Sequence, residues 1–158
     1  MICKTPLSWR FCGSRFAYIY AIYSVKSKLC YIGQTNDRAG IIGRLSGHLD
    51  IRGTFREHFE SIIGLPLDDV EDLHILSENL VDLDLYTGSS SSYREGVEYL
   101  VKSELMKLLA KKKVFIQLIG ETRSMSTTSL DYIKSEASQI AQNMFAEIEI
   151  DYLSALKE

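Results

Sequence analysis

Two short runs of bulky residues near the start of the chain predict a β-hairpin. Residues 18–25 alternate side chains typical of β-strands, and residues 29–33 repeat the pattern after the polar connection 26–28. Side chains two apart on a strand share a face, so Tyr18 and Tyr20 are expected on one side of the sheet. An antiparallel neighbour can then place a residue of the second strand beside them.

After the hairpin, the apolar positions change to helical spacing. Residues 34–37 are polar and typical of a turn, in which Asn36 or Asp37 can cap a helix. That helix carries its apolar residues on one side: Ile41, Ile42, Leu45 and Leu49. A second short helix over residues 54–63 is predicted to end at Gly64.

The second half predicts longer helices and short apolar runs. Residues 72–77 form a candidate third strand, and residues 114–119 are a short apolar run. A helix over 93–113 ends in three lysines, which suit the negative pole of a helix. Residues 78–92 read as an acidic and then serine-rich loop. The apolar stripe of a last helix over 129–157 either packs on the domain's own core or docks a second copy or a partner protein.

These elements predict an α+β fold: a small, mostly antiparallel three-stranded sheet flanked by helices, with an extra C-terminal helix. We divide the chain into an N-terminal arm over 1–15, a domain over 16–119 and a C-terminal helical extension over 120–158. The chain has 158 residues, of which 46% are hydrophobic and 25% are charged, as expected for one compact domain.

Cysteine usage and hydropathy predict a cytoplasmic protein without a membrane partner. The uninterrupted apolar and aromatic stretch 16–23 is too short to span a bilayer, and its tyrosines are too polar for a signal peptide. The three cysteines, Cys3, Cys12 and Cys30, show no CxxC spacing and are odd in number. Neither a disulfide framework nor a zinc site is indicated.

The distribution of charge changes the picture that the net charge suggests. The formal net charge of −3 argues against a polyanion partner, but residues 1–64 carry nine Lys or Arg against four Asp or Glu. The remaining residues then carry nine basic and seventeen acidic side chains. A basic first half beside an acidic second half is a hint of a polyanion-binding face.

The hairpin and the helix after it carry a specific motif. The first strand contains the motif YIY, which ends at Tyr20, and the second contains the motif YIG, which begins at Tyr31, eleven residues later. A polar QTND segment follows, and then a helix with Arg44 and, one turn on, His48. This order resembles the GIY-YIG nuclease family, and the resemblance covers residues 16–119.

The resemblance implies a metal-dependent endonuclease and a role for each matching residue. Tyr20 and Tyr31 would orient or activate water, since phenols beside a phosphate can accept a proton when a cation lowers their pKa. Arg44 would stabilise the charge of the transition state, and His48, on the same helical face, would assist. Glu98 in the long helix would hold one Mg²⁺ or Mn²⁺ ion, for which a carboxylate is a suitable hard ligand.

The sequence departs from the family pattern at three places. Tyr18 stands where the family has Gly, and a second register, Ala21-Ile22-Tyr23, would bring Tyr23 in place of Tyr20 with a shorter tyrosine spacing. An insertion at 38–40 makes Arg38 a rival of Arg44. The Asn that the family carries after the glutamate helix has no clear counterpart, and Gln117 is the candidate for its place.

Several side chains remain alternatives or secondary candidates. Glu95 and Glu104 are rivals of Glu98 as the metal ligand. Five residues are candidates for contact with nucleic acid: Lys26, Lys28, Gly33, Arg38 and Gln117.

The expected partner is DNA, with RNA as a less favoured substrate. The alternative function is a catalytically impaired module of the same fold that binds nucleic acid or a protein partner without turnover. Target choice would come from the insertions 38–40 and 78–92, from a homodimer through the C-terminal helix, or from a partner protein.

Overall fold

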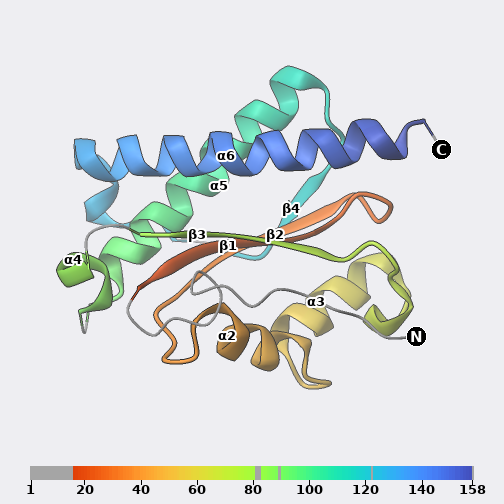
Figure 1. The fold of residues 1–158 in the computed structure, drawn as a ribbon, viewed down its shortest axis with the longest axis horizontal. Helices are drawn as coiled ribbons and strands as arrows, with labels where there is room; N and C mark the ends of the chain where they lie inside the picture. Colours follow the sequence, from red (N-terminus) through yellow and green to blue (C-terminus); the bar gives the residue numbers. More distant parts are fainter. Residues whose placement is uncertain (1–15, 81–82, 89, 122, 158) are drawn as a thin grey trace.

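A four-stranded sheet forms the centre of the molecule (Figure 1). The computed structural model describes residues 16–80, 83–88, 90–121 and 123–157, so the expected N-terminal arm over 1–15 lies outside the described residues. The strands, in the spatial order β3-β1-β2-β4, are β1 (Tyr18–Ser24), β2 (Leu29–Thr35), β3 (His74–Asn79) and β4 (Gln117–Ile119).

The predicted hairpin is confirmed, and so is the third strand. β1 pairs antiparallel with β2, in a register that places Tyr20 opposite Gly33, and antiparallel with β3 on its other side. The prediction of only three strands is wrong, because β4 adds a fourth that runs parallel to β2. Three residues are too few to show a strand period, so the apolar run that contains β4 could not be assigned from its pattern.

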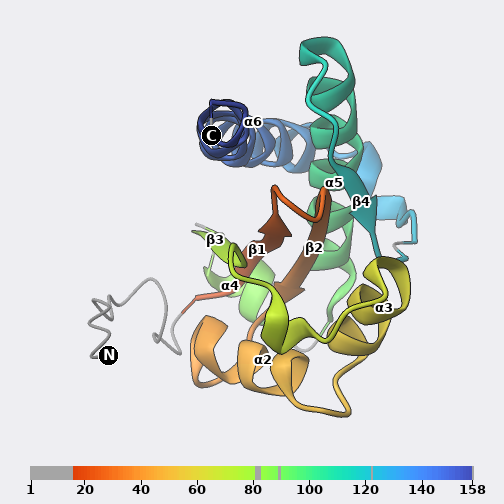
Figure 2. The ribbon, with the colours of Figure 1, turned by 90° about the vertical axis from the view of Figure 1, so that its right-hand side faces the viewer.

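Helices cover both faces of this mixed sheet, as Figures 1 and 2 show. One face carries α2 (Gly40–Leu49) and α3 (Thr54–Ile63), and the other carries α5 (Ser92–Lys112) and α6 (Asp131–Ala155). Three of them, α3, α5 and α6, were predicted within a few residues of these bounds, and α2 contains the four apolar residues of the first predicted helix. The shorter helices are η1 (Leu67–Asp69), α4 (Leu83–Thr87) and η2 (Ser126–Ser129).

The alternation of β1 separates two apolar clusters. Tyr18, Tyr20 and Ile22 face α2 and α3, where they pack with residues such as Phe55. The residues between them, Ile19 among them, face the large core under α5 and α6. The expectation that Tyr18 and Tyr20 share a face is therefore confirmed, and that face carries the candidate site.

Two local expectations need correction. α4 lies within the segment 78–92 that the composition predicted as a loop. The residue that caps α2 is Ala39, not Asn36 or Asp37. Asp37 instead accepts the backbone N–H of Ala39 at 2.8 Å, which closes the turn ahead of the helix. Short polar side chains form such turns as readily as they cap helices.

The apolar stripe of α6 is buried against the protein's own core. Five of its members lie under 4% exposed and join the same cluster as β1 and α5: Ile133, Ala137, Ile140, Met144 and Ile148. Within the described part of the chain, no helix combines the length and apolarity needed to cross a membrane.

Candidate active site

A tyrosine from the first strand lies at the centre of the candidate site. Tyr20 of β1 is 1% exposed, and its hydroxyl lies 2.6 Å from Nε2 of His48 on α2. The ring centroid of Tyr31, on the neighbouring strand β2, lies 6.2 Å from that of Tyr20. The pairing register thus brings together two tyrosines that are eleven residues apart in the sequence.

Gly33 gives Tyr20 its space. A Cβ atom at Gly33, directly opposite Tyr20 in the register, would lie 2.4 Å from the Tyr20 hydroxyl and 2.9 Å from the Tyr31 ring. Real Cβ atoms do not approach other atoms so closely, so a larger residue would displace one tyrosine. Packing against the two tyrosines therefore explains why Gly33, the last residue of the YIG motif, is a glycine.

Gly33→Ala is expected to lower the free energy of unfolding by about 1–3 kcal/mol, because the methyl group overpacks the two tyrosines. Gly47→Ala is the matched control: a Cβ there meets nothing within 4 Å. In the interior of α2, that change should raise stability by about 1 kcal/mol. Urea unfolding of both variants measures the difference. Equal effects of the two substitutions would contradict the packing assigned to Gly33.

His48 is held as a neutral ring. Its side chain lies on the buried side of α2, four residues after Arg44, and is enclosed by the rings of Tyr31 and Phe55, with centroid distances of 5.3 Å and 6.0 Å. Burial, and secondly the charge of Arg44, lowers the pKa of His48 to about 4. At neutral pH, His48 can therefore accept a proton.

Hydrogen bonds link Arg44, Tyr20 and His48. Nε of Arg44 lies 3.3 Å from the Tyr20 hydroxyl, and a guanidinium group can only donate. The hydroxyl oxygen accepts from Arg44, and its own O–H can donate to Nε2 of His48 in the tautomer that leaves this nitrogen without a proton. Burial, and secondly the nearby Tyr31, raises the pKa of Tyr20 above its ordinary range, so this chain has a neutral phenol at its centre.

Glu98 of α5 lies near this cluster. Burial raises the pKa of Tyr31, and the charge of Glu98 raises it further. Burial also raises the pKa of Glu98 itself to about 7, while Lys102 and Arg44 pull it down and Glu95 raises it. The structure thus gathers four elements, β1, β2, α2 and α5, around one site.

The donor set at Glu98 suits a magnesium or manganese ion that keeps most of its water. Among the residues that the structure describes, no three His, Cys, Asp or Glu side chains come together as a metal cage. Mg²⁺ is commonly held by one or two carboxylates, with waters and substrate phosphates completing its octahedron. The single, partly buried carboxylate of Glu98 fits this mode of binding.

The rivals of these residues have different surroundings. Tyr23 belongs to the opposite face of β1, and its hydroxyl donates to Oδ2 of Asp151 on α6 at 2.5 Å. Glu104 is ion-paired with Lys107, with 2.6 Å between Nζ and Oε1. Glu95, one turn from Glu98, acts on it only through its charge. Arg38 lies exposed in the turn before α2. Tyr23 and Glu104 are therefore engaged away from the cluster in which Tyr20 and Arg44 are hydrogen-bonded to each other.

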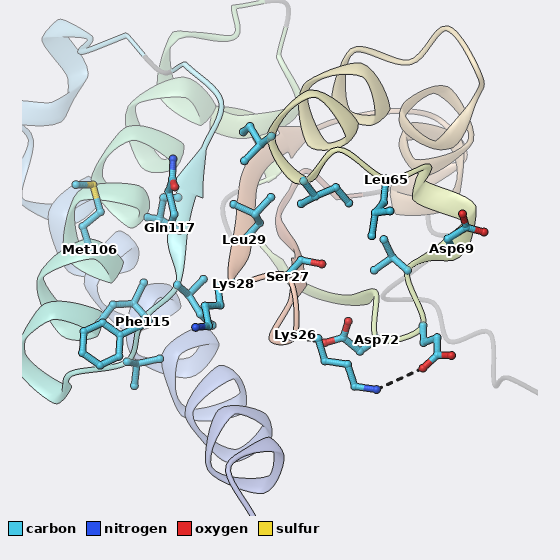
Figure 3. A pocket seen from close by; sticks show the side chains of 18 of the residues that line it. Lys26, Ser27, Lys28, Leu29, Leu65, Asp69, Asp72, Met106, Phe115 and Gln117 are labelled. Carbon is cyan, nitrogen blue, oxygen red and sulfur yellow. Dashed lines mark hydrogen bonds and ion pairs between the residues drawn. The ribbon is translucent and has the colours of Figure 1, made fainter. Parts of the chain in front are cut away.

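Three of the candidates for nucleic-acid contact surround a separate groove. Figure 3 shows Lys26, Lys28 and Gln117 around a cavity of about 1010 Å³, which Leu65 and Met106 also line. Lys26 is engaged there in an ion pair with Glu71 at 3.4 Å.

Gln117 lies at the turn end of the hairpin. It pairs with Leu29, whereas Gly33, beside Tyr20, lies four residues further along β2. At about 3.3 Å per residue, these two positions are about 13 Å apart along the strand, and Tyr31 lies between them.

Two cations on α5, Arg94 and Lys102, were not predicted from the sequence motif. Arg94 is 5% exposed and donates to the side chain of Gln34 on β2, and Lys102 donates to backbone carbonyls after β4. The signal that could have found them is their spacing, since each lies four residues from Glu98.

This arrangement places an exposed guanidinium, a buried phenol and a buried neutral imidazole side by side. Its chemical capacities are anion binding at Arg44 and proton exchange between Tyr20 and His48. Comparison of the chain with family models, with curated proteins and with solved structures gave no match, so its function has to be derived from the site itself.

Proposed function

We propose that the protein is a divalent-metal-dependent endonuclease that hydrolyses phosphodiester bonds of DNA. The observation that supports this most is the hydrogen-bonded chain from Arg44 through Tyr20 to His48, packed beside Tyr31. A permanently charged donor, a phenol and a neutral base then adjoin one carboxylate, Glu98, whose charge acts on both tyrosines. These functional groups are suited to the hydrolysis of a phosphodiester.

The dyad of Tyr20 and His48 provides a path for the proton of the attacking water. Burial raises the pKa of the phenol and lowers that of the imidazole, so a free phenolate is disfavoured. We therefore expect Tyr20 to act as a relay: its oxygen receives the proton of the water as its own proton moves to Nε2 of His48. Negative charge that grows on the phosphate offsets the cost of the resulting imidazolium.

Arg44 and Glu98 act on the phosphate. The side chain of Arg44 is exposed, so part of its donor fork is accessible to a ligand while Nε holds Tyr20. Arg44 would bind phosphate oxygens and stabilise their charge in the transition state. Glu98 would hold one Mg²⁺ or Mn²⁺ ion, which when bound polarises the phosphate and stabilises the leaving oxygen.

Purified protein is expected to nick or linearise supercoiled plasmid DNA when Mg²⁺ or Mn²⁺ is present, and EDTA should stop the reaction. An RNA of the same sequence should be cleaved more slowly, and faster cleavage of RNA would reassign the substrate. Binding, measured by fluorescence anisotropy, should weaken linearly with log salt if several phosphates are contacted. Absence of cleavage with either metal, in protein that binds DNA, would reject the enzyme and support a binding module.

A further inference from the structure

One face of α5 carries three charged residues at intervals of a helical turn. Arg94, Glu98 and Lys102 lie four residues apart, so their side chains project from the same side of the helix. The two cations therefore lie one turn before and one turn after the candidate metal ligand. Each of them reaches a different part of the structure around the tyrosines.

Arg94 ties the first turn of α5 to β2. Its Nε donates to Oε1 of Gln34 at 3.0 Å, and Gln34 directly follows Gly33. Its Nη1 donates to the carbonyl of Tyr86 at 2.5 Å and reaches two further carbonyls, of Gly88 and Ser90. A buried cation is costly unless its donors are satisfied, so these contacts hold the helix in one place on the sheet.

Lys102 ties the next part of α5 to the turn after β4. Its Nζ donates to the carbonyls of Ile119, at 3.3 Å, and Gly120. Gly120 has a φ of +85°, and a Cβ atom there would lie 2.8 Å from the Tyr31 ring. The backbone that Lys102 holds is therefore the surface on which Tyr31 rests.

We propose that Arg94 and Lys102 are positioning residues, which dock α5 on β2 and on the turn after β4 and so keep Glu98 and Tyr31 in register with each other. Neither cation need touch the substrate. The catalytic consequence rests on the proposed nuclease function, whereas the docking of Tyr31 does not.

Lys102→Met is the principal test, with Lys107→Met as its matched control. Lys107 lies on the same helix but forms an exposed ion pair with Glu104. A displaced catalytic group costs about ten- to a hundredfold in rate. We expect kcat for plasmid cleavage to fall by that factor in Lys102→Met, with KM unchanged, and neither constant to change in Lys107→Met.

A spectroscopic measurement keeps the test independent of activity. The ¹⁹F NMR signal of Tyr31 in protein labelled with 3-fluorotyrosine is assigned as the one missing from Tyr31→Phe. Lys102→Met should shift or broaden this signal, and Lys107→Met should leave it as it is. Arg94→Lys, which keeps the charge but loses the planar fork, should lower kcat in the same way.

The outcomes separate this inference from the proposed function. If the wild-type protein cleaves no DNA but the Tyr31 signal responds only to Lys102→Met, the nuclease proposal fails and the docking stands. If the Tyr31 signal is unchanged in Lys102→Met, the inference is overturned, whether or not the protein is a nuclease. A rise in KM without loss of kcat would also overturn it, since it would make Lys102 a substrate-binding residue.

Discussion

Glu98→Gln is expected to abolish metal-dependent cleavage of DNA while the fold stays intact. Glutamine keeps the size of the side chain but offers a divalent cation only a neutral oxygen. The metal contributes several kcal/mol to the transition state of such reactions. Its loss corresponds to a fall in rate of about 1000-fold or more. Glu104→Gln, on the same helix but ion-paired with Lys107, is the control and should cleave like the wild type.

The stability of Glu98→Gln has a predictable dependence on pH. Burial raises the folded-state pKa of Glu98 from 4.5 to about 7, so the folded protein binds this proton more tightly than the unfolded chain does. The wild type therefore loses stability as the pH rises from 4.5 to about 7 and the Glu98 carboxyl gives up its proton. The amide of the variant has no proton to lose, so its stability does not change for this reason. The stability of the variant relative to the wild type should rise between pH 4.5 and about pH 7.

Urea unfolding at the two pH values checks this expectation. A variant that cleaves as well as the wild type would reject Glu98 as the metal ligand. A relative stability that falls with rising pH would show instead that the carboxylate is stabilised in the folded protein. The two measurements are independent, because one reports on metal-bound turnover and the other on the metal-free chain.

Arg44→Ala is expected to lower kcat by about 100- to 1000-fold, which is the cost of losing one preorganised donor to a developing negative charge. Affinity for DNA should change far less, because one phosphate contact is a small part of binding to a long polyanion. Single-turnover cleavage and anisotropy on the same oligonucleotide separate the two quantities. Arg52→Ala is a suitable control, since Arg52 lies 91% exposed between α2 and α3.

The same variant distinguishes the nuclease from its main alternative. A module that binds nucleic acid without turnover would lose affinity alone when Arg44 is removed. If kcat fell in Arg38→Ala and was unchanged in Arg44→Ala, stabilisation of the transition state would belong to Arg38, in the turn before α2. The hydrogen bond from Arg44 to Tyr20 predicts the opposite result.

Local patterns were sufficient to predict most elements of the fold. The hairpin and the four main helices each contain enough residues to show a period of two or of 3.6 in the sequence. Burial recurs at helical spacing in α3, α5 and α6, whereas β1 is buried on both faces. β4 could not be predicted because it has three residues and its partner β2 lies more than eighty residues earlier. Its parallel pairing depends on where α5 returns the chain.

In the candidate site too, some relations between residues can be predicted from local patterns and others cannot. The relation between Arg44 and His48 is local, since residues four apart on a helix share a face. The relation between Tyr20 and Tyr31 follows from the hairpin register. Glu98 was matched by resemblance alone, and no pattern in its own segment indicates which strand it faces.

The sequence by itself determined most of the elements and the shared face of Tyr18 and Tyr20, because these depend on contacts between near neighbours in the chain. It also singled out Tyr20, Arg44 and His48 as candidates through their resemblance to a family motif. Only the tertiary structure decided that Tyr20 links Arg44 to His48, that Gly33 leaves room for Tyr20, and that two cations dock α5 beside Tyr31. These are contacts between segments far apart in the chain. Side-chain packing selects them, and no spacing along the sequence records them.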